Sequence, residues 1–400
     1  MKMNSHIGAA TASEVTDQSP LSLMMIVSTC LISAVSAVMF NIMPLFLGAA
    51  ADAYGLTDLQ LGLLGSAGLL GATLVALTSI VWVRRVNWQV LSVIAFALTI
   101  VFLIIYASLQ SFYGMLGMQF LIGCCLGSTF SVILCLIGDV PHPDSLFAFK
   151  SFAEIALGCI LMYLLPRVVI PRWGFPGILI SVVIVVALLA PFILFLPRRA
   201  VKNTVLKSSK EQGNRLTWVA LFAMFLFFGA MAGFWAFLER IGVDGGLSQT
   251  DVSTAIVVSM VIGLIATLIG GIIGDRFGRT IFLLASAVLL GIGMILLAQF
   301  QTVLLYLVAS CIFSFGWNYI MPYQMAIIGE ADTSGRLIVL IAVALTLGGA
   351  FGPVLTGVVK TGSSYLPIFL VTGVAVVVST ILFILVVRHL SNQRSCTNRL

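Results

Sequence analysis

The chain has 400 residues, of which 60% are hydrophobic and only 8% are charged. A water-soluble domain of this size cannot carry so apolar a composition on its surface, so soluble enzymes and soluble binding modules are excluded and a polytopic membrane protein is indicated. The formal net charge of +6 is explained by membrane topology, and we expect no nucleic-acid partner.

Apolar stretches of about 20 residues, the length that crosses a bilayer as a helix, recur along the chain. The twelve predicted spans are 21–48, 60–82, 88–109, 112–137, 146–166, 177–196, 216–238, 252–273, 280–299, 303–328, 337–359 and 366–387. The longest polar stretch between spans, 197–215, divides them into two groups of six. The predicted parts are a tail (1–20), an N-terminal six-helix bundle (21–196), a linker (197–215), a C-terminal six-helix bundle (216–387) and a second tail (388–400).

Lysine and arginine concentrate on one side of this predicted topology. With the N-terminus inside, 16 cations fall on the cytoplasmic side or the adjoining helix ends and 4 on the other side. Such an asymmetry is the positive-inside pattern of membrane proteins. We therefore expect a multi-pass protein of the inner, cytoplasmic membrane, with both termini and the linker in the cytoplasm and the bilayer as its surroundings.

Ionisable residues inside predicted spans are costly and are candidates for function. Lys150 and Glu154 lie four residues apart in span 146–166, so they share one helix face. The pair can be a neutral structural brace or a proton or substrate relay, and the sequence leaves both readings open. Glu239 follows span 216–238 beside Arg240, and adjacent residues do not share a helix face. Because Glu239 has no cation three or four residues away, it is the better candidate for a proton site.

Span 303–328 contains an unusually polar segment, FGWNYIMPYQ, at residues 315–324. Its aromatic faces and amides can bind a solute, and Pro322 removes one backbone hydrogen bond. The candidate solute-binding residues of this segment are Trp317, Asn318, Tyr323 and Gln324. Hydrogen bonding between helices is the alternative reading of each one of them.

Short motifs recur 191 residues apart. The tripeptide YGL at 54–56 corresponds to GGL at 245–247, Arg85 corresponds to Arg276, and LIGD at 136–139 corresponds to IIGE at 327–330. Agreement of three motifs in one register indicates two homologous halves. Parallel six-helix halves are a plan of secondary transporters, which place the solute path between the repeats.

The segment GDRFGRT at 274–280 resembles the loop signature of the major facilitator superfamily, G-x-x-x-D-R-x-G-R-[RK]. Thr280 replaces the last basic residue, and the corresponding loop at 83–89 keeps only Arg85, with Arg84 at the acidic position. Segments 119–127 and 348–357 also resemble family patterns, although Gln119 replaces an arginine. The resemblance implies a cytoplasmic gate formed by Gly274, Asp275, Arg276, Gly278, Arg279 and Arg85. The alternative is that the loop arginines only anchor the topology.

The resemblance also implies that the first, fourth, seventh and tenth spans line a central cavity. It adds Asn41, Gln119 and Trp235 to Asn318 and Gln324 as cavity-lining candidates. It implies an all-α fold of two pseudo-symmetric six-helix bundles. Within this fold, Glu239 and the pair Lys150–Glu154 are the candidates for proton coupling.

Catalytic and cofactor motifs are missing from the sequence. It has no phosphate-binding loop, no dinucleotide-binding glycine motif and no His-Glu-x-x-His motif. The seven cysteines lie almost entirely in apolar runs without Cys-x-x-Cys spacing, and the three histidines are scattered. We therefore expect no enzymatic activity, no metal and no cofactor, and an ATP-driven pump is unsupported.

These observations favour a secondary transporter, or permease, that moves a small organic solute by alternating access, coupled to protons. We expect a monomer that takes up a metabolite or organic acid, because span 146–166 lacks the G-x-x-x-G-P segment of drug exporters in the family that it resembles. Proton-coupled efflux of drugs or metabolites is the first alternative. A receptor or scaffold without transport is the second.

Overall fold

The computed structural model describes residues 22–140, 143–199, 215–273, 278–332, 340–360, 362 and 364–397. These residues form helices and no strand. The first bundle contains α1 (Leu23–Ser36), α2 (Val38–Asn41), α3 (Met43–Tyr54), α4 (Asp58–Trp82), α5 (Trp88–Ala107), α6 (Phe112–Asp139), α7 (Pro143–Leu164), η1 (Leu165–Val169), α8 (Ile170–Leu189) and η2 (Ala190–Phe195). The second contains α9 (Arg215–Asp244), α10 (Gln249–Ile273), α11 (Arg279–Ala298), α12 (Val303–Ala331), α13 (Leu340–Val359) and α14 (Leu366–Thr397).

Ten helical stretches of the described chain are long and apolar enough to cross a membrane. One of them, Leu146–Phe195, has 50 residues and contains two crossings, because the backbone leaves helical geometry at Gly174 (φ 59°, ψ −151°). Helices α1 to α3 together form one more, interrupted crossing. The all-α fold of twelve crossings is therefore confirmed.

The first crossing differs from the continuous span that the sequence predicts. The helix breaks at Ala37 and again at Ile42, where φ and ψ are near −95° and 0°. Pro44, in the first turn of α3, lacks the N–H that would bond to the carbonyl of Phe40 four residues earlier. The break therefore leaves a backbone acceptor available near the middle of the crossing.

The repeat seen in the sequence is present in the helices themselves. A shift of 191 residues carries α4 onto α10 and α5 onto α11 at both ends, and carries the start of α6 onto the start of α12. Gly55 and Gly246, which occupy corresponding turns, both have positive φ, of 61° and 93°. The matching helix bounds and the positive φ at both turns confirm two structurally related halves.

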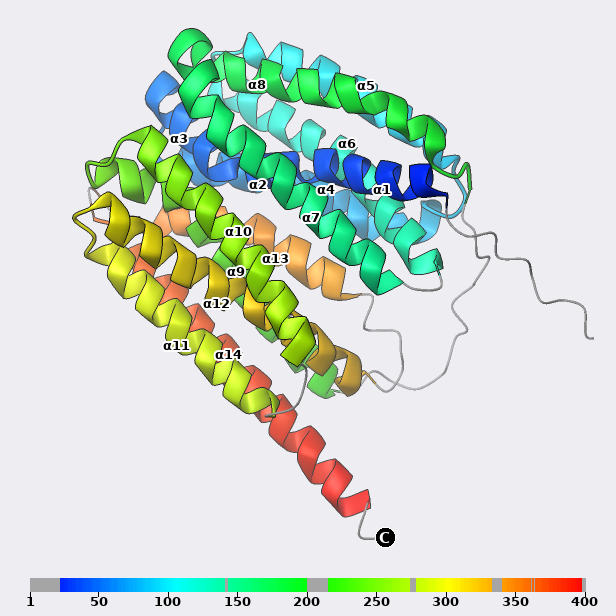
Figure 1. The fold of residues 1–400 in the computed structure, drawn as a ribbon, viewed down its shortest axis with the longest axis vertical. Coiled ribbons are helices and arrows are strands. Elements are labelled where there is room, and N and C mark those ends of the chain that lie inside the picture. The colour runs from blue at the N-terminus through cyan, green and yellow to red at the C-terminus, as the bar shows by residue number, and fades with distance from the viewer. Residues whose placement is uncertain are drawn as a thin grey trace, which may run out of the picture.

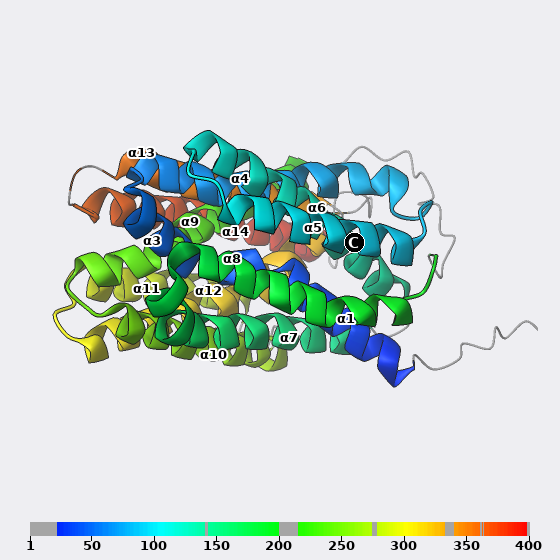
Figure 2. The same ribbon diagram turned by 90° about the horizontal axis from the view of Figure 1, so that it is seen from above.

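The two bundles pack chiefly along α4 with α13, α7 with α10 and α3 with α9, with smaller contacts of η1 with α10 and of α4 with α9. Figure 2 shows the first two pairs on opposite sides of the molecule. We call the face where η2 ends and α9 begins the linker face, and the opposite face, with the turns at 55–57 and 245–248, the distal face. In Figure 1 the bundles lie close together at the distal face and diverge towards the linker face.

Candidate functional site

Glu239 of α9 lies at the boundary between the bundles and is 0% exposed. Its Oε1 accepts a hydrogen bond from Gln249 Nε2 at 3.1 Å. Its Oε2 is buried and has no hydrogen-bond partner among the described residues. The carboxyl group lies directly against Gly48 of α3, where a Cβ atom would overlap with it. A buried acid with an unpartnered oxygen is costly, and glycine at position 48 is what allows the bundles to close over it.

The next residue, Arg240, forms ion pairs at the distal end of the same boundary. Its guanidinium lies 2.6 Å from Asp52 of α3, in the other bundle, and 2.9 Å from Asp244 of its own helix. Asp244 also accepts a hydrogen bond from the Tyr365 hydroxyl at 2.5 Å. Burial and this hydrogen bond raise the pKa of Tyr365, so its hydroxyl stays protonated and remains a donor. Arg240 thus joins the two bundles.

A second cross-bundle ion pair joins α13 to α4. Lys360 lies 2.9 Å from Asp58, and its ammonium is 4.6 Å from the ring centroid of Tyr365. Further from the distal face, the Val354 N–H donates to Ser66 Oγ at 3.0 Å. A Cβ atom on Gly62 would overlap with the Pro353 carbonyl, so the two helix backbones are in direct contact. The boundary between α4 and α13 is closed at this depth.

The pair α7–α10, together with η1, is closed in the same half. Arg167 of η1 donates to Thr254 Oγ1 of α10 at 2.6 Å, and Cys159 Sγ lies 3.8 Å from the Val257 carbonyl. Where both partners are described residues, every hydrogen bond and ion pair between the bundles lies in the distal half or at the centre. The conformation is closed towards the distal face.

Two of the predicted cavity residues meet at the centre. Trp235 Nε1 donates to the Phe40 carbonyl at 3.1 Å, which fills the acceptor that Pro44 leaves available. The Trp235 ring lies 6.2 Å from that of Trp317, and Trp317 lies 6.1 Å from Phe228. Phe228 in turn stacks on Phe40 at 6.2 Å. These four rings, Phe40, Phe228, Trp235 and Trp317, form the aromatic centre of the molecule and span both bundles.

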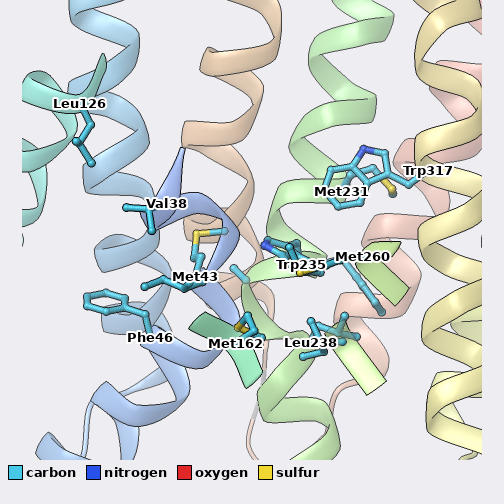
Figure 3. Packing of buried hydrophobic residues seen from close by; sticks show 14 of the residues in the cluster. Val38, Met43, Phe46, Leu126, Met162, Met231, Trp235, Leu238, Met260 and Trp317 are labelled. Atoms are coloured by element: carbon cyan, nitrogen blue, oxygen red, sulfur yellow. The ribbon is translucent and has the colours of Figure 1, made fainter. Parts of the chain in front are cut away.

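Methionine side chains surround the aromatic centre. Figure 3 shows Met43, Met162, Met231 and Met260 around Trp235 within the buried cluster. Thioether side chains are flexible and fill irregular space beside aromatic rings. The surface where the bundles meet at mid-depth is therefore apolar and adaptable.

The pair Lys150–Glu154 lies in the first bundle, with 2.7 Å between Nζ and Oε1. Glu154 Oε1 also accepts from Ser33 Oγ of α1 at 2.5 Å, and the Lys150 ammonium lies 4.6 Å from the ring centroid of Phe130 in α6. The two side chains are 7% and 14% exposed. The predicted shared face is confirmed by this ion pair, and α1, α6 and α7 meet at it.

Asn41 connects this ion pair to the aromatic centre. Its Nδ2 donates to the Glu154 backbone carbonyl at 2.9 Å, and the preceding residue, Phe40, accepts the bond from Trp235. A Cβ atom on Gly158, one turn after Glu154, would lie 2.8 Å from Asn41 Cβ and 2.9 Å from Met260 Cε. The short α2 helix therefore has the ion pair on one side and the aromatic centre on the other.

Two other amides predicted to line a cavity face neighbouring helices of their own bundles. Gln119 is 5% exposed, and a Cβ atom on Gly68 of α4 would lie 3.1 Å from its Nε2. Asn318 donates to the Ser314 carbonyl of its own helix at 2.9 Å and lies against Gly263 of α10. Both side chains contact glycines at close helix–helix approaches.

The remaining two residues of the polar α12 segment are buried in the second bundle. The Tyr323 ring packs on Phe282 of α11, with 4.6 Å between centroids. Gln324 is 1% exposed, and its Oε1 has no hydrogen-bond partner within the described part of the chain. Of the candidate solute-binding residues of the α12 segment, Trp317 is the one that belongs to the aromatic centre.

The predicted cytoplasmic gate is described only in part, because Gly274, Asp275 and Arg276 lie outside the described residues. Gly278 precedes α11 with φ 81°, and Arg279 lies 2.5 Å from Glu330. Arg85 is exposed, whereas its neighbour Arg84 lies 2.9 Å from Asp139. Each of these two ion pairs lies within a single bundle, Arg84–Asp139 in the first and Arg279–Glu330 in the second.

Several contact residues escaped the sequence analysis. Gly48, Ser33 and Phe40 contact partners more than 100 positions away in the sequence, and no local sequence pattern predicts these contacts. Two features of the sequence could nevertheless have pointed to the break in the first crossing and to the distal ion pairs. Pro44 marks the break four residues after Phe40, and Asp52 and Asp58 flank the turn between the first two crossings.

Comparison with known proteins places this geometry in a family. The sequence matches the Major Facilitator Superfamily over residues 27–331 and 220–395. A relative from Bacillus subtilis (strain 168), the uncharacterized MFS-type transporter YdeG, is 32% identical over 113 residues. That match spans 26% of this chain and 25% of the relative.

Solved transporters share the fold at low sequence identity. The nucleoside transporter NupG superposes with a TM-score of 0.71 at 14% identity, covering 92% of this chain and 98% of that one. The D-xylose–proton symporter gives 0.75 at 14%, covering 91% and 97%. A bacterial homolog of the human lysosomal transporter Spinster, inward-facing and occupied, gives 0.71 at 12%, covering 92% and 96%. The chain belongs to the Major Facilitator Superfamily, a family of multi-pass secondary transporters.

Proposed function

We propose that the chain takes up a small organic metabolite by alternating access, coupled to protons through Glu239. The observation that carries this proposal is the position of Glu239. It is fully buried at the bundle boundary, against Gly48, in the region that must separate when the distal face opens. A carboxyl group whose access to water changes with the conformation has the property that proton coupling needs.

Alternating access explains why the boundary carries so many breakable contacts. Opening the distal face must separate Asp52 from Arg240, Asp58 from Lys360 and Gly48 from Glu239. Water then reaches the Glu239 carboxyl group, which gains or loses its proton. Closing the same contacts buries the group again, so the proton moves with the conformational change.

The environment of Glu239 distinguishes it from the other acids of the boundary. Its described hydrogen-bond partner is a neutral amide, Gln249, whereas Asp52 and Asp58 each pair with a cation. The neighbouring Arg240 is engaged by Asp52 and Asp244. Glu154 pairs with Lys150 and is the second candidate for the coupled proton.

The positive-inside asymmetry of the sequence supports a linker face in the cytoplasm, at an inner membrane. The structure, closed towards the distal face, then corresponds to an inward-facing conformation. The name of the D-xylose–proton symporter, which shares the fold, describes a protein that moves a solute together with a proton. We therefore favour uptake, in which solute and proton enter together from the distal face.

The test is a transport screen with the full chain in proteoliposomes that contain a pH-sensitive dye. Radiolabelled amino acids, sugars, nucleosides and organic acids are added one class at a time, with and without an imposed pH gradient. We expect one class to accumulate only with the gradient and to acidify the lumen when it enters. Binding of a solute without movement across the bilayer would instead indicate a receptor. Accumulation that ignores the pH gradient would remove the proton from the mechanism.

A further inference from the structure

We propose that the solute is an amphipathic zwitterion, with a carboxylate that binds Lys150, an ammonium group that binds Glu154 and an apolar body that packs on the aromatic centre. This inference rests on the transport function proposed above and names the class of its solute. It starts from the ion pair that the first bundle holds beside the α2 break.

The ion pair is built so that its members can separate. Lys150 and Glu154 lie on consecutive turns of one helix, and both have long, flexible side chains. Glu154 is the one acceptor that the described residues give to Lys150, whose other contact is the face of Phe130. Glu154 keeps the Ser33 hydroxyl as a second partner. A ligand carboxylate can therefore replace Glu154 at Lys150 while Lys150 keeps its contact with Phe130. A ligand ammonium group can likewise replace Lys150 at Glu154 while Glu154 keeps its bond to Ser33.

Charge balance selects the class of ligand. Separating a buried ion pair is costly if either member is left without a counter-charge. An anionic solute would satisfy Lys150 and leave Glu154 unpaired, and a cationic solute would do the reverse. A ligand that carries both charges replaces one ion pair by two, and the buried net charge stays zero. Sugars and nucleosides offer hydroxyl groups and cannot compensate either member.

The apolar body of the ligand follows from what lies across α2. Asn41 bonds to the backbone of Glu154, and the adjacent Phe40 bonds to Trp235, so the ion pair and the aromatic centre are neighbours. Phe228, Trp235 and Trp317 pack on one another there, and Met260 Cε lies beside Gly158, one turn after Glu154. Rings and thioethers stabilise an aromatic or branched apolar group. The described amides Gln119 and Asn318 face glycines of their own bundles instead.

Glu239 does not compete for this ammonium group in the conformation described. Its carboxyl group is fully buried against Gly48, one turn beyond Trp235 towards the distal face. The two acids therefore have separate tasks, with Glu154 holding the solute and Glu239 exchanging the proton. Separate sites also make the two proposals separable by experiment.

The test uses four probes that share an apolar body or a charge pattern: L-phenylalanine, phenethylamine, 3-phenylpropanoate and L-alanine. Binding to the full-length purified protein is measured by displacement of tritiated L-phenylalanine and by thermal shift. We expect L-phenylalanine to bind at least tenfold more tightly than each of the other three. Equal or tighter binding of phenethylamine or 3-phenylpropanoate overturns the proposal, and so does the absence of L-phenylalanine binding to folded protein.

Single variants at Lys150 and Glu154 should show opposite preferences between the two singly charged probes. Lys150→Gln should favour phenethylamine over 3-phenylpropanoate, and Glu154→Gln should favour 3-phenylpropanoate over phenethylamine. Trp317→Ala should reduce the preference for L-phenylalanine over L-alanine while the charge preference stays. Phe152→Leu, an exposed position of the same helix, is the control and should bind as the unaltered chain does. Single variants that weaken all four probes equally mean that the pair is a brace, which overturns the proposal.

If the single variants do not fold, the double variant Lys150→Met/Glu154→Met removes both charges at once. It should bind L-phenylalanine no better than an uncharged analogue, L-phenylalaninamide acetylated at nitrogen; a retained zwitterion preference overturns the proposal. Proton-driven transport of a solute without both charges also overturns it but leaves the proposed function intact. Binding of L-phenylalanine without any transport contradicts the proposed function instead.

Discussion

Ion pairs at the distal face connect the two bundles, whereas those towards the linker face connect helices of the same bundle. At the distal face Arg240 and Lys360 each pair with an aspartate of the other bundle. Towards the linker face Arg84 and Arg279 pair with Asp139 and Glu330 of their own bundles. Cross-bundle pairs must break whenever the distal face opens, whereas pairs within a bundle move with it. These ion pairs therefore hold the two bundles together at the distal face and hold helices of one bundle together towards the linker face.

The largest expected effect comes from the group that the distal contacts enclose. Glu239→Gln removes the exchangeable proton while it keeps the shape and the bond to Gln249. Gradient-driven accumulation should be abolished, and solute exchange should remain measurable, because exchange needs no net proton movement. Accumulation and counterflow in proteoliposomes measure the two. Asp251→Asn, the same change at an exposed acid of α10, is the control. Accumulation by Glu239→Gln that still follows the pH gradient would exclude Glu239 and point to Glu154.

Gly48→Val should prevent the closure over Glu239, because any Cβ atom there overlaps with the carboxyl group. Overpacking of this kind costs about 1–3 kcal/mol, which shifts a conformational equilibrium by about 5- to 150-fold. We expect slower transport and faster maleimide labelling of Cys159, which lies at the closed boundary. Gly117→Val, at a glycine with open space around it, is the control. Unchanged labelling at Cys159 would mean that the bundles do not separate there.

The two distal ion pairs should differ in strength according to their burial. Lys360 is 7% exposed, so its ion pair with the partly exposed Asp58 is the more buried of the two, and Lys360→Gln should lower transport by about tenfold. Asp52 is 57% exposed, and exposed pairs contribute about 0.2–1 kcal/mol, so Asp52→Asn should lower it less than about fivefold. Initial rates at matched expression decide this order. Activity restored by the swapped pair Asp52→Arg/Arg240→Asp would show that the pair itself acts.

Arg84→Gln should have the smallest effect on transport, because the ion pair that Arg84 forms with Asp139 lies within one bundle. Thermal stability in detergent should fall by a few degrees, whereas the rate per folded protein should stay within about twofold. The loop resemblance adds that Asp275→Asn should slow transport more than Arg84→Gln does. A large loss of rate in Arg84→Gln at unchanged stability would place Arg84 in the gate and erase the difference between the two faces.

The comparison also shows what local sequence patterns could predict about the site. The spacing of Lys150 and Glu154 predicted a shared face, and the structure has an ion pair there. The polar segment 315–324 suggested one solute-binding surface, but a helix distributes consecutive residues around its axis. Trp317 belongs to the aromatic centre, while Asn318 faces Gly263 and Tyr323 faces Phe282. Composition locates polar residues, and only the neighbouring helices decide where each one points.

The sequence by itself determined the membrane class, the crossings, the repeat of 191 residues and the family resemblance. These properties depend on hydrophobicity summed over about 20 residues and on motifs a few residues long. Only the tertiary structure decided that Gly48 lies against Glu239, that Trp235 fills the acceptor freed by Pro44, and that Ser33 bonds to Glu154. The physical reason is that these contacts join residues more than 100 positions apart, whose meeting depends on how whole helices pack.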